Sequence, residues 1–507
     1  MKKLNLLVLG ILSVSLTNAQ DITDALRYSQ NEIQGTARFR ALSGAFGALG
    51  GDMSAVSLNP AGSAVFSKSH ASFTLSNLET NSDTKYFNGF NSSSETKFDI
   101  NQGGLVFVFG NQSSSNPWKK FTLGIAYDKT NNFDDNWFAS GTNTNNDNNF
   151  SNSIASYFYD YADGVRLGDI SLLDGESISQ AYSDIGNVFG FGPQQAFLGY
   201  QSYILDPVVD DDNNTLYSAN ISNGDFNQNY SYVATGYNGK MTFNFATQYE
   251  DNLYLGINLN SHFINYDRST SLIETNQNPS LNYINFDNNL STTGNGFSFQ
   301  LGGIIKLSPE FRVGVTYDSP TWYTIDEETS QYLATDGEDN GFIEINPQVV
   351  NIYPRYRLQT PAKITGSFAY IFGDKGLFSF DYSRKDYSST KFKPTTDPFF
   401  TTQNNIINSD LVSASTYRFG AEIREKQFSF RGGYRFEQSP YKNGLTVGDL
   451  NGYSFGIGFN FGNTKLDITY DQAKRKSQNQ LYNVGLTDAA LIDAKNSNIT
   501  FSLGFNI

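Results

Sequence analysis

Connections of two very different lengths alternate along this chain and join segments that have the residue pattern of β-strands. The short turns contain only three or four residues, whereas most of the loops between them are long and polar. An antiparallel barrel in an outer membrane has this arrangement, because its strands meet through short periplasmic turns and longer external loops. The short turns are Glu250–Asn252, Ser308–Glu310, Gly373–Lys375, Glu425–Gln427 and Gly462–Lys465, with a looser turn at 111–120.

Apolar residues alternate with small or polar residues within the strand-like segments. The pattern is clearest at 253–260, 453–461 and 499–506. Such a period of two gives each strand one lipid-facing side and one side that faces a lumen. A soluble sandwich has the same alternation, but both of its ends face one compartment, so it gives no reason for short turns at one end only.

The sequence therefore predicts an all-β fold, a transmembrane antiparallel up-and-down β-barrel of about 14 strands. An even number fits closed single-chain bacterial barrels. Aromatic residues form 15% of the 507 residues, yet the mean hydropathy is only -0.41, far below that of a helical membrane protein. The expected strands are 71–78, 103–110, 121–128, 239–249, 253–266, 296–307, 311–318, 357–372, 376–387, 410–424, 428–437, 452–461, 466–473 and 498–507.

The N-terminus has the pattern of a secretory signal peptide over residues 1–19. Lys2 and Lys3 precede an apolar stretch at 4–16, and small residues at 17–19 predict cleavage before Gln20. We expect a bacterial outer-membrane location. The chain has no Cys, which excludes disulfides and lipidation at a new N-terminal Cys. A net charge of -15 argues against nucleic acid as a partner.

Two segments do not fit the barrel wall, namely 20–67 and a long external excursion at about 130–238. The excursion contains an Asn-rich stretch at 141–152, and helices are expected at 154–162 and 177–188. Its aromatic residues predict either a hydrophobic landing surface or a small core of the loop itself. These residues are Tyr157, Phe158, Tyr159, Tyr182, Phe189, Phe191 and Phe197.

The segment from Ala37 to Gly62 resembles the hatch signature of the FadL family of outer-membrane transporters. A Gly-Ala-Phe stretch at 44–46, the acidic Asp52 and the motif Asn59-Pro60-Ala61-Gly62 occur in the family's order. Weaker similarity continues at 314–320, 360–362, 432–440 and 466–470. Outside this context, an Asn-Pro pair would indicate only a surface turn.

The resemblance implies passive uptake of hydrophobic compounds such as long-chain fatty acids. External loops would capture the solute, a greasy pocket beneath them would hold it, and a hatch formed by 20–67 would plug the lumen and gate lateral release through the wall. The family's opening lies beside a kinked third strand, here 121–128, where Gly124 is best suited to a kink. The expected partners are a hydrophobic ligand and outer-membrane lipid, and the barrel is expected to be monomeric.

Strand alternation turns a cluster of arginines toward the lumen, namely Arg418, Arg424, Arg431 and Arg435. They would either bind a ligand carboxylate through charge-assisted hydrogen bonds or hold the plug by pairing with Glu422, Asp381 and Asp467. The second interpretation is favoured.

Enzymatic chemistry finds little support in the sequence. His70 and His262 are the two histidines, and their separation predicts no metal site; we expect no cofactor. His262 is the residue most able to serve an outer-membrane hydrolase, but a lone His is more often a polar lumen residue. Two alternatives to transport remain open: a FadL-like barrel that docks a protein-secretion system, and a general porin.

Overall fold

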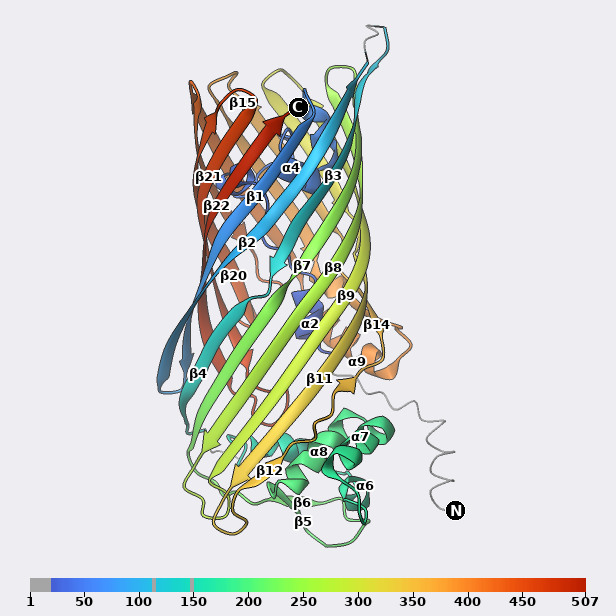
Figure 1. Cartoon of the computed structure of the whole chain (residues 1–507), viewed down its shortest axis with the longest axis vertical. Coiled ribbons are helices and arrows are strands. Elements are labelled where there is room, and N and C mark those ends of the chain that lie inside the picture. Colours follow the sequence, from blue (N-terminus) through green and yellow to red (C-terminus); the bar gives the residue numbers. More distant parts are fainter. Residues whose placement is uncertain (1–19, 112–114, 146–149) are drawn as a thin grey trace.

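The computed structural model describes residues 20–111, 115–145 and 150–507, so the expected signal peptide at 1–19 lies outside the described residues. The described chain forms a closed antiparallel barrel in which the first strand, β1 (His70–Tyr86), pairs with the last, β22 (Ala489–Asn506) (Figure 1). Each wall strand pairs with the wall strands next to it in the sequence, apart from the seam described below, as an up-and-down barrel requires.

The described wall has 14 strands, as predicted, and four of them run in two pieces. The divided strands are β3 (Trp118–Asn132) with β4 (Asp135–Asn143), β10 (Phe311–Asp318) with β11 (Trp322–Asp336), β15 (Lys363–Ile371) with β14 (Tyr356–Gln359), and β16 (Gly376–Asp386) with β17 (Lys391–Lys393). The others are β1, β2 (Gly89–Gly110), β7 (Phe226–Tyr249), β8 (Leu253–Thr275), β9 (Tyr283–Lys306), β18 (Ser413–Glu425), β19 (Phe428–Glu437), β20 (Val447–Asn460), β21 (Thr464–Gln480) and β22. Short strands β12 (Ile343–Ile345) and β13 (Asn351–Ile352) pair with β11, while β5 (Leu205–Pro207) and β6 (Tyr217–Ala219) form a separate sheet.

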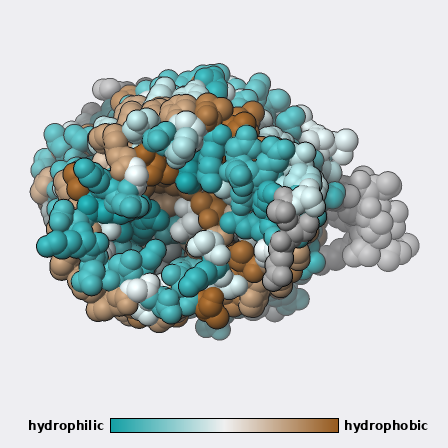
Figure 2. Space-filling model, turned by 90° about the horizontal axis from the view of Figure 1, so that it is seen from above, coloured by the Kyte–Doolittle hydropathy of each residue, from teal (hydrophilic) through white to brown (hydrophobic). Residues whose placement is uncertain are grey.

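The alternation of side chains is confirmed and locates the membrane level. On β20, Phe455 and Ile457 are 61% and 51% exposed on the outer face, whereas Ser454 is 1% exposed and points inward. Outward residues on β8 change from apolar Leu259 to polar Asp267 with distance from the short turns. The apolar band therefore covers the half of the barrel that carries the short turns. Figure 2 looks onto this end and shows a mainly hydrophilic rim around a central hollow.

Much of the sequence that was predicted to form long external loops continues as strand. The clearest case is the β1–β2 hairpin, where Tyr86 pairs with Gly89 and only Phe87 and Asn88 form the turn. Above the membrane the outward residues are polar, so the apolar-outward alternation that marks a lipid-facing strand disappears although the backbone ladder continues. The excursion expected at 130–238 is correspondingly shorter, because β4 and the first half of β7 belong to the wall.

A helical cap closes the external end (Figure 1). It contains α5 (Ala155–Ala162), α6 (Leu167–Ile170), α7 (Ile178–Phe189) and α8 (Phe191–Gln201); α5 and α7 confirm the two expected helices. Phe158, Tyr182 and Phe197 are fully buried and pack with Phe286 of β9. Most of the predicted landing aromatics therefore form a core between cap and barrel, and Phe189, at 39% exposure, is the one exposed aromatic of that set.

The N-terminal segment lies inside the barrel rather than outside it (Figure 1). It forms α2 (Ile22–Arg27), α3 (Ala37–Ala41), α4 (Met53–Leu58) and the 3-10 helix η1 (Pro60–Val65). Two further elements, the 3-10 helix η2 (Tyr387–Ser389) and α9 (Pro398–Asp410), follow β16 on the external side. Among the described helices, none has the length and apolar character needed to cross a membrane.

Candidate functional site

The Asn-Pro-Ala-Gly motif begins η1 and binds the inner wall. Asn59 caps the helix by accepting a hydrogen bond from the Ala61 N–H at 3.1 Å. Its Nδ2 donates to the carbonyl oxygens of Gly47 and Gly303 at 2.7 and 3.2 Å. A single side chain therefore ties together two parts of the N-terminal segment and β9. This excludes the interpretation of the motif as a surface turn.

Two wall glycines make this close approach possible. A Cβ atom on Gly302 would lie 2.0 Å from the Asn59 Oδ1, and one on Gly256 would lie 2.4 Å from the Pro60 carbonyl carbon. Only glycine leaves room for such close contacts with the Asn59 side chain and the Pro60 backbone.

Amide side chains of the wall bind the adjoining turns. Asn244 donates to the Pro60 carbonyl at 2.9 Å, Asn258 to Val56 at 2.8 Å and Gln300 to Ser57 at 3.1 Å. The N-terminal segment is thus hydrogen-bonded to the continuous wall formed by β7, β8 and β9.

The third strand also contacts this segment, through Ser63 Oγ and Thr122 Oγ1 at 2.8 Å. The prediction of a kink at Gly124 is wrong, because regular ladders to β2 and β7 pass through Gly124 on both sides. Gly124 instead leaves room for neighbouring side chains, since an added Cβ would lie 3.3 Å from atoms of Val106 and Asn244. The irregularities of this strand occur at its two ends, at Trp118/Lys120 beside the short turns and at Lys129/Asn131 and the gap between β3 and β4 on the external side.

A seam in the wall begins just beyond Gly124. The β2–β3 ladder ends at the pair Gln102–Asp128, while β3 and β4 stay paired with β7. The outer half of β2 therefore has no ladder to β4 among the described residues. We use "seam" for the boundary between 89–101 of β2 and 129–143 of β3 and β4. Its start is one residue beyond Tyr127, at the outer edge of the apolar band.

Side chains bridge the seam in place of a ladder. Ser93 Oγ donates to the Asn136 carbonyl at 2.5 Å, and Lys97 Nζ lies 2.6 Å from Asp134 Oδ1. Lys129 forms a second ion pair, with Asp99. These few side-chain contacts can separate one at a time, whereas a continuous backbone ladder must break many hydrogen bonds together. In each ion pair one partner, Lys97 or Asp99, is partly exposed and the other is buried.

The N-terminal segment reaches the same place from inside. The Glu32 N–H donates to the Thr130 carbonyl at 3.0 Å, and the Glu32 carboxylate accepts from the Asn132 N–H at 3.4 Å.

Glu422 is the centre of the predicted arginine cluster, and its contacts fit the plug-holding interpretation. Its carboxylate is 1% exposed and lies 2.9 Å from Arg38 of the N-terminal segment, 2.6 Å from Arg424 and 2.6 Å from Arg431. Arg431 also pairs with Asp467 at 2.5 Å. Two carboxylates thus pair with three arginines and bind the segment to β18, β19 and β21.

Two more carboxylates bind the segment on this side. Asp381 accepts hydrogen bonds from the N–H groups of Phe46 and Gly47, both at 3.0 Å. Asp471 pairs with Arg40 at 2.8 Å.

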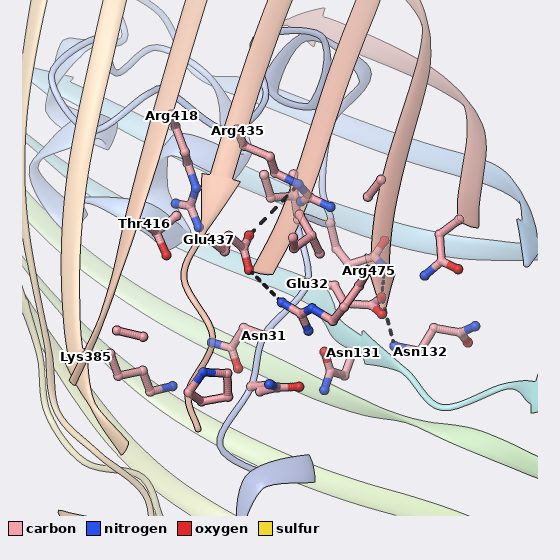
Figure 3. Close-up of a pocket in the computed structure, with 18 of the residues that line it drawn as sticks. Asn31, Glu32, Asn131, Asn132, Lys385, Thr416, Arg418, Arg435, Glu437 and Arg475 are labelled. Atoms are coloured by element: carbon pink, nitrogen blue, oxygen red, sulfur yellow. Dashed lines mark hydrogen bonds and ion pairs between the residues drawn. The ribbon is translucent and has the colours of Figure 1, made fainter. Parts of the chain in front are cut away.

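Arg418 and Arg435 differ from the other two arginines because they face a cavity. This cavity has a volume of about 310 Å³ and lies between the segment 30–34, the seam and the strands β15 to β22. In Figure 3 the side chains of Arg418, Arg435 and Lys385 project into it, and Glu437 lies between Arg435 and Arg475. A much smaller hollow of about 10 Å³ continues from it to the seam and shares Gln34, Leu78, Asn132 and Asn498 with it.

The cavity is not the greasy pocket that the resemblance implied. Eight of its lining residues are Lys or Arg and two are Glu. The cations are Arg27, Arg40, Lys363, Lys385, Arg418, Arg435, Lys474 and Arg475, and the acids are Glu32 and Glu437. Lys363 and Lys385 were not among the predicted site residues, although the alternation that turns Thr365 and Ser383 inward applies equally to these lysines.

Above the membrane, α2 is joined to the barrel through a buried carboxyl group. Glu327 of β11 accepts hydrogen bonds from Gln20 Nε2 at 2.6 Å and from the Tyr356 hydroxyl at 2.8 Å. Burial raises the pKa of Glu327 to about 7, and the nearby Asp24 adds to this.

His262 lies in the wall and contacts a serine. Its Nε2 is 2.8 Å from Ser298 Oγ, but its Nδ1 has no hydrogen-bond partner among the described residues. A Ser-His catalytic pair needs a third group that orients the imidazole, so this pair lacks the arrangement of a hydrolase. In the part of the chain that the structure describes, no group of His, Asp and Glu residues is suited to a metal ion.

Comparison with known proteins shows the family. The model of the outer membrane protein transport protein family (OMPP1/FadL/TodX) matches residues 240–507. The chain belongs to this family. It is an outer-membrane barrel of a family that transports hydrophobic compounds. A search of curated proteins finds no match.

Solved structures show the same fold at low sequence identity. A FadL homologue of Pseudomonas aeruginosa has a TM-score of 0.58 and 12% identity, with 94% of this chain and 99% of that chain covered. The toluene transporter TodX of P. putida has a TM-score of 0.52 and 11% identity, with 94% and 99% covered. The toluene transporter TbuX of Ralstonia pickettii has a TM-score of 0.50 and 15% identity, with 94% and 100% covered.

Proposed function

We propose that this protein mediates passive uptake of hydrophobic small molecules and releases them sideways through the seam between β2 and β4. The observation that carries the proposal is the junction of an internal cavity, the N-terminal segment and an incompletely paired wall. Segment 30–34 lines the cavity, and Gln34 also lines the small hollow at the seam. A shift of this segment would join the cavity to the barrel surface at the outer edge of the apolar band.

Capture would begin on the cap. Apolar side chains are exposed there although the cap's own core is complete, and exposed apolar groups of this kind favour contact with hydrophobic solutes. They are Leu172, Leu173, Val188, Phe189, Val208, Val209 and Leu216. From the cap the solute would pass into the lumen, and consumption inside the cell would keep the gradient directed inward.

The segment 20–67 acts as the hatch in this scheme. Its contacts divide into a firmly bound part at Asn59 and Glu422 and a part near Glu32 that has few contacts. We propose that only the second part moves during transport, so that the membrane stays closed to ions and sugars.

Uptake measurements test the function. Cells that carry the protein in a lipopolysaccharide-containing outer membrane should take up labelled toluene or decanoate several-fold faster than cells that lack it. Proteoliposomes should show no swelling in sugar solutions. Swelling with sugars would identify a porin, and absence of all three fluxes would leave the secretion-docking role.

A further inference from the structure

The cavity cations are arranged in a way that a purely structural network would avoid. Lys363 and Lys385 are directly opposite each other in the β15–β16 ladder, and Arg418 and Arg435 are directly opposite in the β18–β19 ladder. Opposite residues that face the same side have Cβ atoms about 5 Å apart, and like charges at such positions destabilise a sheet. The two pairs lie on four adjacent strands and face one cavity, four register positions apart, because Lys385 is opposite Ala414 and Arg418 is opposite Asp381 in the β16–β18 ladder.

The available carboxylates neutralise this group only in part. Lys363 pairs with Asp318 at 2.8 Å, and Glu437 lies 4.0 Å from Arg435 and 3.5 Å from Arg475. Among the described residues, neither Lys385 nor Arg418 forms an ion pair with a carboxylate.

The remaining contacts of these two residues are limited. Lys385 donates to the carbonyl of Ser29. The buried Arg418 Nε has no hydrogen-bond partner in the described chain. Asp381 is opposite Arg418 on β16, but its carboxylate accepts the hydrogen bonds of Phe46 and Gly47.

The Glu422 cluster on the same two strands provides the contrast. There, one buried carboxylate binds three arginines, and Asp467 binds one of them again. The chain therefore pairs its cations where they hold the hatch and leaves Lys385 and Arg418 without a carboxylate where they face open space.

We propose that the cavity binds the oxyanion of a solute that also has a small apolar body, such as an aromatic carboxylate or sulfonate. The oxyanion would lie between Lys385 and Arg418, where ionised donors form strong hydrogen bonds. Leu78, Phe133 and Leu450 line the same cavity and would contact the apolar body. This inference rests on the proposed transport function and specifies its substrate class: the cavity selects charged amphiphiles over neutral hydrocarbons.

Calorimetric titration of the purified full chain in a nonionic detergent tests this inference with two probes that share one ring. Benzoate should bind at least tenfold more tightly than benzyl alcohol. Arg418→Gln and Lys385→Gln should each weaken benzoate binding about tenfold and leave the thermal midpoint unchanged or higher, because each removes one member of a like-charged pair. Arg355→Gln removes an external, 67% exposed arginine side chain that pairs with Asp326, and it should change nothing.

Equal binding of the two probes, or full benzoate binding by both variants, would overturn the inference. Inorganic phosphate that competes as well as benzoate would also overturn it, since a bare oxyanion would then suffice. If benzoate fails to bind while toluene uptake persists, only this inference fails; if benzoate binds and neither toluene nor decanoate uptake occurs, only the proposed function fails.

Discussion

Neighbouring strands are joined differently in the β7–β8 wall and in the β2–β4 wall. The β7–β8 ladder is continuous from Asn227–Thr275 to Tyr249–Leu253. The β2–β3 ladder stops at Gln102–Asp128, and side chains join the strands beyond it. A continuous ladder opens only if many backbone hydrogen bonds break together, whereas side-chain bridges separate one at a time. The difference indicates which part of the barrel is a fixed support and which part can open.

The hatch contacts follow the same division. We call the wall strands with continuous ladders, including β7 to β9 and β18 to β21, the sealed side. There, Asn59 and Glu422 are buried and fully partnered. Beside the seam, Glu32 is an exposed residue with weaker contacts. Changes on the sealed side should therefore alter stability strongly, and changes at the seam should alter flux with little effect on stability.

The largest expected effect comes from Glu422→Gln. This change leaves Arg38, Arg424 and Arg431 without their shared carboxylate, and removing one partner of a buried pair costs about 3–5 kcal/mol. Hydrogen exchange in the segment 37–47 should accelerate by at least a hundredfold. The matched control is Glu425→Gln at the exposed end of the same strand. Unchanged exchange in Glu422→Gln would show that these charges do not hold the hatch.

The next effect concerns the cap, which is joined to β8 through Glu274. This fully buried carboxyl accepts hydrogen bonds from Ser153, the Ile154 N–H and Gln228, and burial raises its pKa from 4.5 to about 7. A raised pKa in the folded state means that folding takes up a proton, so the cap should lose stability as the pH rises from about 4.5 to 7.

Exchange rates of the α5 amides across this pH range measure the effect, after correction for intrinsic exchange. The shift corresponds to about 3 kcal/mol at most, since one pKa unit equals about 1.4 kcal/mol. Glu274→Gln should abolish the pH dependence. A dependence that survives in this variant would assign it to another group.

A steric change sharpens the comparison on the sealed side. Gly302→Val forces side-chain atoms into the space of Asn59 and should destabilise the hatch contact by about 1–3 kcal/mol, as overpacking does. Gly303→Val on the adjacent, outward-facing position meets only an ordinary contact 3.7 Å from Leu255. Protease sensitivity of the segment 50–65 should therefore rise in the first variant and not in the second. Equal sensitivity would mean that close packing at Gly302 is unimportant.

The smallest change in stability is expected at the seam. Lys97→Met removes the ion pair with Asp134. The lysine side chain is 46% exposed, and Asp134, although only 3% exposed, keeps the hydrogen bond from the Gly236 N–H, so the loss should be about 1 kcal/mol, well below that at the Glu422 cluster. The thermal midpoint should stay nearly constant, while toluene uptake should increase. Lys476→Met removes an exposed pair with Asp493 in the continuous β21–β22 ladder and should not affect uptake. Equal uptake by the two variants would contradict a special role of the seam.

The membrane-level wall could be predicted because lipid imposes a pattern on the sequence. Every expected strand coincides with part of a wall strand, since outward residues such as Phe455 must be apolar. The external halves could not be predicted in this way, because outward residues such as Asp267 face water. The pair Asn88-Gly89 signals a hairpin in that region, although the two-residue turn is Phe87-Asn88, one position earlier than the Asn-Gly rule would place it. The helix α8 was not predicted, because Gly192, Pro193 and Gly199 interrupt the helical periodicity of its apolar residues.

The site was predictable only where a motif fixed it. Asn59 was recognisable within the N-terminal segment, but the resemblance placed the wall irregularity at Gly124, too close to the short turns. The seam depends on where a ladder ends, and no residue between Lys129 and Asp135 marks that point in the sequence. Whether each arginine pairs with a carboxylate or faces the cavity depends on distances between side chains, and strand alternation does not give these distances. The monomeric state and the signal peptide remain predictions.

A reversible disulfide engineered across the seam tests lateral release most directly. Because the chain contains no Cys, Ser93→Cys with Asn136→Cys introduces a single pair at the position where these residues now make contact. Ser231→Cys with Ser271→Cys introduces the matched pair across the continuous β7–β8 ladder. Toluene uptake should fall to the background rate when the seam pair is oxidised, recover on reduction, and stay unchanged in the control. Full uptake through the oxidised seam would contradict release between β2 and β4.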